Sequence, residues 1–285
     1  MRSIKWLAFG VAVGALFVVE RLRPLRTRKE PGVERVGRNL VIGLLAAATT
    51  AVSEWPIVGP VQGLAERGRL GLLRGLPLPR PLRIVFGFLL LDYTLYIWHW
   101  LNHRSPFLWR FHAVHHVDLD LDSTTGLRFH AGELALAAGF RAAQILLLGV
   151  DRETLRLWQQ LLVCSVMFHH SNLELPIGLE RRLVRVIATP RMHGIHHSTR
   201  AGEINANYSS LLSCWDRLHG SLCLNIPQAQ VEIGIPGYLL PEDNRVINVL
   251  VMPFRRQRDY WRGPGGTTAA RPARPNASRG SRMAK

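Results

Sequence analysis

Five apolar runs, separated by basic and polar stretches, form the main pattern of this 285-residue chain. The runs are Ile4–Val19, Leu40–Val52, Ile84–Leu101, Leu134–Val150 and Leu155–Phe168. Each is at or below the ~20 residues that a membrane span requires, and Asp92, Arg141 and Arg156 place charges in three of them. One such run alone would also suit a buried helix of a soluble protein. Five in one chain favour an all-α, integral-membrane helical bundle with about 4–5 membrane helices.

The first run has two interpretations. Arg2 and Lys5 precede a short apolar core, as in a secretory signal peptide. The residues after the core, Glu20-Arg21-Leu22-Arg23-Pro24, lack the small side chains of a cleavage site. We therefore expect an uncleaved membrane helix.

The distribution of charge indicates which side of the membrane the loops occupy. The formal net charge is +16, and Arg21–Arg38 holds seven basic residues against two glutamates. A basic loop between apolar runs is typical of the cytoplasmic side of a membrane. Nucleic-acid binding is the other common reason for such a charge. We disfavour it because the basic residues lie between apolar runs and in the C-terminal tail rather than along one helix face.

A cytoplasmic Arg21–Arg38 brings the polar ends of the third and fifth runs to that same side. Residues 54–83 would then lie on the opposite side, although they include five arginines. Either Gln62–Leu73 is an amphipathic helix in the membrane interface, or the second run returns to the side from which it entered. The sequence leaves both arrangements open.

Histidines supply the candidate chemistry. Eleven of the twelve lie between residues 99 and 197, in the patterns HxxxH from His99, HxxHH from His112 and HxxHH from His193. Positions i, i+3 and i+4 of a helix lie close together, so each pattern can present two or three imidazoles to one site. Their eight imidazoles exceed the roughly four to six ligands of one metal ion, which predicts two metals. The HExxH motif of zinc proteases is absent.

The order HxxxH, HxxHH, HxxHH resembles the fatty acid hydroxylase/sterol desaturase superfamily of integral-membrane di-iron oxidases. The similarity runs from about Asp92 to Gly220. It includes Leu108-Trp109-Arg110-Phe111-His112, Thr189-Pro190, Asn207-Tyr208 and Trp215-Asp216-Arg217-Leu218. The resemblance implies two further ligands, His130 and His170, although Ala131 replaces the proline that usually follows the first of these. The full set of expected ligands is His99, His103, His112, His115, His116, His130, His170, His193, His196 and His197.

Other side chains are expected to orient these ligands by accepting their outer N–H groups. Candidates are Asp92, Glu133, His169, Asn207 and Asp216. Asp92 lies inside an apolar run, where an acid needs a partner, and two helical turns before His99. We expect Glu133 to serve His130. For His169, a role beside the ligands and that of an ordinary helix-end histidine are equally open.

The resemblance also implies a cytoplasmic helical cap that carries the two metals, taken as iron, although zinc also accepts imidazole ligands. It implies hydroxylation or desaturation of a lipid from the bilayer with O2. The electrons would come from a separate reductase or carrier, because the chain has no flavin, haem or iron–sulfur motif. Trp98, Trp100, Phe107 and Trp109 would line the substrate entrance or anchor the membrane interface. The alternative is a non-enzymatic membrane protein with a structural zinc site.

The chain is therefore expected to divide into four parts. N-terminal membrane and interfacial helices with basic loops occupy residues 1–83, and the histidine-rich catalytic domain occupies 84–225. Residues 226–261 form a segment packed on the cap. Residues 262–285, rich in Gly, Pro, Ser and Arg, form a disordered basic tail.

Overall fold

The computed structural model describes residues 2–263, and within this range the regular elements are helices, which confirms the all-α prediction. The predicted tail, apart from its first two residues, lies outside the described residues. The α-helices are α1 Arg2–Leu22, α2 Gly32–Arg67, α3 Leu72–Gly75, α4 Arg80–Arg104, α5 Pro106–His116, α6 Ala131–Leu148, α7 Arg152–His170, α8 Ile177–Leu183, α9 Pro190–His196, α10 Ala201–Ile204, α11 Cys214–Leu218 and α12 Val246–Val251.

Three stretches of the described chain are long and apolar enough to cross a membrane: Gly32–Gly75, Arg80–Arg104 and Ala131–Leu148. They contain the second and third apolar runs and all but the last two residues of the fourth. The fifth run forms α7, whose first turns carry Arg152, Glu153 and Arg156 and are more polar. The first run forms α1. A membrane bundle is thus consistent with the structure, while the number of four to five spans stays a prediction.

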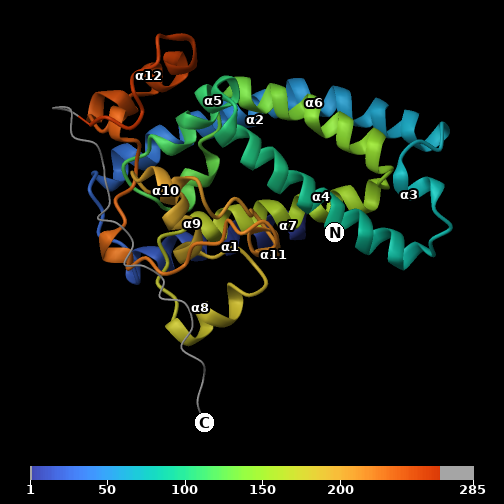
Figure 1. The fold of residues 1–285 in the computed structure, drawn as a ribbon, viewed down its shortest axis with the longest axis horizontal. Coiled ribbons are helices and arrows are strands. Elements are labelled where there is room, and N and C mark those ends of the chain that lie inside the picture. Colours follow the sequence, from blue (N-terminus) through green and yellow to red (C-terminus); the bar gives the residue numbers. More distant parts are fainter. Residues whose placement is uncertain (1, 264–285) are drawn as a thin grey trace.

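The long helices connect two different ends of the molecule (Figure 1). α2 packs lengthwise against α6, and α4 crosses between this pair and α7. α3 and the α6–α7 turn lie at one end, whereas α5, α9 and α10 gather at the other. Outward-facing side chains of α2 are apolar, with Leu44 71% and Val52 77% exposed. Such a surface suits contact with lipid tails.

The end that contains α3 is held by a close backbone contact. Gly71 has φ +100°, and a Cβ there would lie 2.2 Å from the backbone nitrogen of Gly149. Gly149 itself ends α6 with φ +68°. Both positions therefore require glycine. Because α2 is one continuous helix over Gly32–Arg67, the second run does not turn back, and residues 68–79 lie at the end opposite α5 and α9.

The C-terminal segment packs over α5. One buried core cluster combines Ile42 from α2 and Trp109 from α5 with Ile235 and Val249. Tyr260 and Trp261 pack against the same cluster. Burial of this apolar surface ties residues 235–261 to the helix that carries the second histidine motif.

Candidate metal centre

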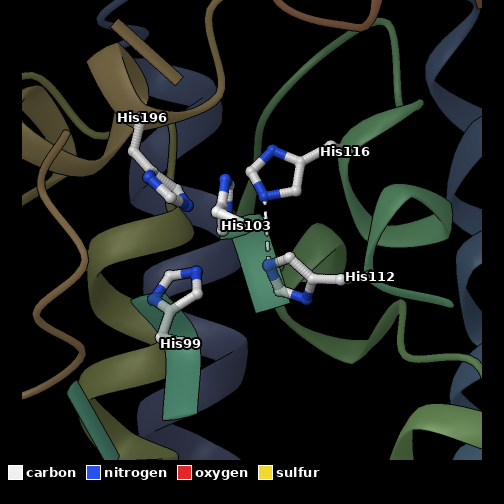
Figure 2. Close-up of side chains that lie close together, drawn as sticks. All are labelled: His99, His103, His112, His116 and His196. Carbon is white, nitrogen blue, oxygen red and sulfur yellow. Dashed lines mark hydrogen bonds between the residues drawn. The ribbon is translucent and has the colours of Figure 1, made fainter. Parts of the chain in front are cut away.

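Nine histidines form two compact groups at the α5–α9 end of the molecule. The first group is drawn in Figure 2, where its rings point toward a shared centre. It consists of His99, His103, His112, His116 and His196, and the second group consists of His115, His170, His193 and His197. In each group, every histidine contributes one ring nitrogen, and these nitrogens all lie within 4.8 Å of one another.

Each HxxHH motif serves both groups. In α5, His112 and His116 face the first group, and His115 faces the second. The motif around α9 is divided the opposite way, because His193 and His197 face the second group and His196 faces the first. Successive helix positions differ by about 100°. Relative to position i, position i+4 is therefore rotated by about 40° in one direction and position i+3 by about 60° in the other. The spacing thus builds two neighbouring sites from two short helices.

The facing atoms in both groups are Nε2 nitrogens. In the second group, Nε2 of His170 lies 2.9 Å from Nε2 of His115 and 2.9 Å from Nε2 of His193. In the first group, the Nε2 atoms of His112 and His116 are 3.2 Å apart. Two nitrogens bound at right angles, each about 2.1 Å from one metal, would lie about 3 Å apart. The imidazoles therefore fit around a metal ion at both places.

Hydrogen bonds on the outer nitrogens fix which ring atom faces inward. The Nδ1 atoms of His99, His170 and His196 lie 2.7–2.8 Å from the backbone carbonyls of Tyr208, Val166 and Ala206, respectively. A carbonyl only accepts, so each Nδ1 carries the proton and each Nε2 presents a lone pair. Nε2 of His99 and of His196 is buried without a hydrogen-bond partner. A buried lone pair without a partner costs about 1–3 kcal/mol, which a metal ion would offset.

The electrostatics of the groups also suit a cation. Burial, followed by the proximity of other histidines, lowers the pKa of five of these rings well below the ordinary value of 6.5. These are His115, His116, His193, His196 and His197. The rings are therefore neutral at neutral pH, the form in which imidazole binds a metal.

Comparison with known proteins agrees with this geometry. Residues 84–221 match the model of the fatty acid hydroxylase family. This part of the chain belongs to that family. The resemblance drawn from the histidine motifs is thus confirmed, and the match contains every histidine of both groups.

Several curated proteins are similar to the chain over this region. Ornithine lipid hydroxylase OlsE of Rhizobium tropici is 29% identical over 180 residues, which cover 63% of this chain and 52% of that protein. Human cholesterol 25-hydroxylase is 26% identical over 49% of this chain and 50% of its own length. Human alkylglycerol monooxygenase is 26% identical over 52% of this chain and 32% of its own length. The aligned parts thus span about half of these relatives or less. No solved structure matches the chain.

His130, an expected ligand by the family resemblance, lies outside both groups. Its Nδ1 accepts a hydrogen bond from the backbone N–H of Gly132 at 2.9 Å, and its Nε2 lies 3.0 Å from the carbonyl of Leu250. Both ring nitrogens are therefore engaged, and the side chain caps the first turn of α6. The structure therefore places His130 as a helix cap and does not bring it together with the nine grouped histidines.

Glu133 holds a different histidine from the one expected. Its Oε1 lies 2.9 Å from Nδ1 of His112, so the carboxylate orients a member of the first group rather than His130. His169 belongs to neither group, but its ring centroid lies 4.1 Å from that of His193. It lies near the end of α7 and packs beside the second group, so both expected roles stay open.

Three other expected partners act at a greater distance. Asp92 accepts hydrogen bonds from the indoles of Trp158 and Trp215 and from a backbone N–H, and it does not bond to His99. Asp216 accepts the backbone N–H of Tyr208, whose carbonyl orients His99. Asn207 bonds the carbonyls of residues 192 and 223. These residues shape the loops that place the histidines. The backbone carbonyls of residues 206 and 208 contact the rings of His196 and His99 directly. The sequence alone did not reveal these two contacts.

A buried ion-pair network anchors the loop that follows the second histidine motif. Arg35 of α2 contacts Asp118 at 2.8 Å and Asp122 at 2.6 Å. Burial alone would raise the pKa of Asp118, but Arg35 and Arg128 hold it well below its usual range. Asp118 follows His116 by two residues, so the network fixes the end of α5.

Proposed function

We propose that this protein hydroxylates a lipid at a centre of two iron ions held by the two histidine groups. The carrying observation is the convergence of nine buried or half-buried histidines, with their Nε2 atoms facing inward, in a chain of the fatty acid hydroxylase family. All three relatives described above are named as hydroxylases or monooxygenases. Hydroxylation is therefore favoured over desaturation.

The chain's own residues would hold and orient the centre. Bound iron would supply the redox chemistry with O2. Backbone carbonyls and Glu133 hold the outer nitrogens of four histidines, which fixes the direction of their lone pairs. The second group is fully buried, and within the first group only His103 is partly exposed. Substrate would therefore approach on the His103 side.

We further propose that the histidine end faces the cytoplasm and receives electrons from a separate reductase or carrier. The basic stretch Arg21–Arg38 lies at this end, because Arg26 contacts the backbone of α9 and Arg35 contacts the loop after α5. A cytoplasmic position for this stretch agrees with the positive-inside rule.

Metal analysis of detergent-purified protein from iron-replete cells tests the proposal. We expect about two irons per chain. His99→Ala/His103→Ala should remove one metal from the first group, and His170→Ala/His193→Ala should remove the other. His130→Asn, which retains a capping side chain outside both groups, is the matched control and should keep both.

Turnover is the second measurement. With 18O2, a reductant and membrane lipid extract, the wild-type protein should place labelled oxygen in a lipid, and both double variants should not. Two zincs that iron cannot replace, or two irons without any oxygen-dependent lipid product, would overturn the proposal in favour of a structural metal site.

A further inference from the structure

A cavity of about 350 Å³ opens beside the one partly exposed histidine of the first group. Its wall includes His103, Arg104, Trp109, Arg110, Tyr260 and Trp261. The first four come from the α4–α5 corner. The last two come from the C-terminal segment, beyond the part of the chain that the family model matches. The cavity therefore joins a candidate metal ligand to residues outside the family-matched segment.

The charge of the cavity is entirely positive. Two arginines line it, and its lining contains no carboxylate. Within residues 2–263, neither Arg104 nor Arg110 forms an ion pair, in contrast to Arg80 on the same helix, which pairs with Glu153. Arginine presents several N–H donors in a planar fork that suits phosphate and carboxylate oxygens.

The neutral amides of the cavity are already engaged. Asn205 donates its side-chain N–H to the carbonyl of residue 201 at 2.9 Å. Gln257 donates to two backbone carbonyls and accepts from the hydroxyl of Tyr260. Arg104 interacts with the hydroxyl of Tyr208 and with the ring of Trp100. A guanidinium has five N–H donors, so both arginines still have donors to offer a ligand.

The surroundings of the cavity place it at the level of lipid headgroups. Arg104 ends a helix that is long and apolar enough to cross a membrane. Exposed aromatic side chains flank it: Trp100 on the preceding turn, Phe107 after Pro106, and Phe254 beside Phe111. Aromatic rings and long basic side chains are enriched where a membrane meets water. A lipid could place its headgroup in the cavity while its tail stays along α4.

We infer that this cavity binds the anionic headgroup of the lipid substrate, a phosphate or carboxylate, through Arg104 and Arg110. That the bound lipid is the substrate rests on the proposed function. Binding of an anionic headgroup in the cavity does not. The substrate would then be an anionic amphiphile rather than a neutral sterol or hydrocarbon.

Native mass spectrometry of the metal-loaded protein in detergent tests the inference. The probes are phosphatidic acid, phosphatidylcholine and inorganic phosphate. Wild-type protein should retain one phosphatidic acid in preference to phosphatidylcholine. Arg104→Gln/Arg110→Gln should weaken this binding about tenfold or more, as expected for lost charge-assisted hydrogen bonds. Arg181→Gln/Arg182→Gln, two exposed arginines of α8, removes the same charge and should change little.

Equal binding of both lipids, or equal loss in the two double variants, would overturn the inference, because general attraction to a basic protein would then explain binding. Displacement of phosphatidic acid by millimolar inorganic phosphate would overturn the assignment to a lipid, because the cavity would then be a general anion site. Because both arginines are exposed, the variants should fold, and Arg110→Glu alone provides a second test. If the protein binds lipid through these arginines but forms no oxygenated lipid, the inferred headgroup site is supported and the proposed function is refuted.

Discussion

Replacement of Arg35 by methionine is the perturbation that most directly tests how the loop beside the candidate metal centre is supported. The Arg35 side chain is buried, and its guanidinium contacts both oxygens of Asp118, one oxygen of Asp122, the carbonyl of residue 120 and the hydroxyl of Thr125. Methionine fills a similar volume but donates no hydrogen bond. Two buried carboxylates would then lose their nearest counter-ion, and the more distant Arg38 (3.9 Å from Asp118) and Arg21 (3.7 Å from Asp122) would remain.

The magnitude follows from the burial of these groups. Removal of one partner of a buried ion pair costs about 3–5 kcal/mol. Asn39 and Thr125 still donate to Asp118 at 3.2 and 3.0 Å, which keeps the estimate within that range rather than doubling it. For a chain of this size, 1 kcal/mol corresponds to roughly 2–4 °C. We therefore expect Arg35→Met to lower the melting temperature by about 6–20 °C.

Thermal unfolding in detergent, followed by intrinsic fluorescence, is the assay. Arg80→Met is the matched control, because the Arg80–Glu153 pair has the same chemistry but is 74% and 66% exposed, and a surface pair contributes about 1 kcal/mol or less. Addition of Asp118→Asn to Arg35→Met should restore part of the loss by removing one buried charge. A melting temperature for Arg35→Met within about 2 °C of that for Arg80→Met would refute the reasoning.

Three further predictions concern the histidine groups. Glu133→Ala removes the acceptor of His112 and should weaken metal binding about 10–100-fold, as measured by competition with a chromophoric chelator; unchanged affinity would contradict the assigned contact. A Cβ on Gly194 would lie 2.2 Å from the buried guanidinium of Arg26, so Gly194→Ala should cost about 1–3 kcal/mol. Gly202→Ala, with open space around it, should not, and equal melting curves would disprove the steric argument. In the chelator-treated protein, five buried histidines with lowered pKa values protonate only on unfolding. The unfolded chain then binds more protons below about pH 6.5, and the free energy of unfolding should fall between about pH 7.5 and 5.5; a pH-independent melting temperature over that interval would count against neutral rings.

The sequence was sufficient to identify the histidines that come together because their pattern is local. HxxxH and HxxHH place imidazoles on one side of a helix whatever the rest of the chain does. His170 was placed by family resemblance, and it joins the second group. The division of each HxxHH between two groups depends on how α5 and α9 face each other, which no local spacing specifies.

Residues whose partners are distant in the sequence were harder to predict. Glu133 was assigned to His130, three residues away, but bonds to His112, which is 21 residues away. His130 itself was expected to bind metal, yet a position just before α6 makes it a helix cap. Arg35 and Asp118 are separated by 83 residues, and neither carries a local signal for the other. Tertiary packing decides these contacts.

The same packing shows that the family-matched segment, residues 84–221, is not a self-sufficient structural unit. Glu20 of α1 accepts hydrogen bonds from backbone N–H groups of both Ser123 and Asn172, and each of these residues lies close to a histidine motif. Arg35 supplies the counter-charge for the loop after α5. Without residues 20–39, these buried donors and carboxylates would lack partners, at a cost of about 1–3 kcal/mol for each unsatisfied group. The two histidine groups keep a fixed geometry because helices outside the matched segment hold their loops in place.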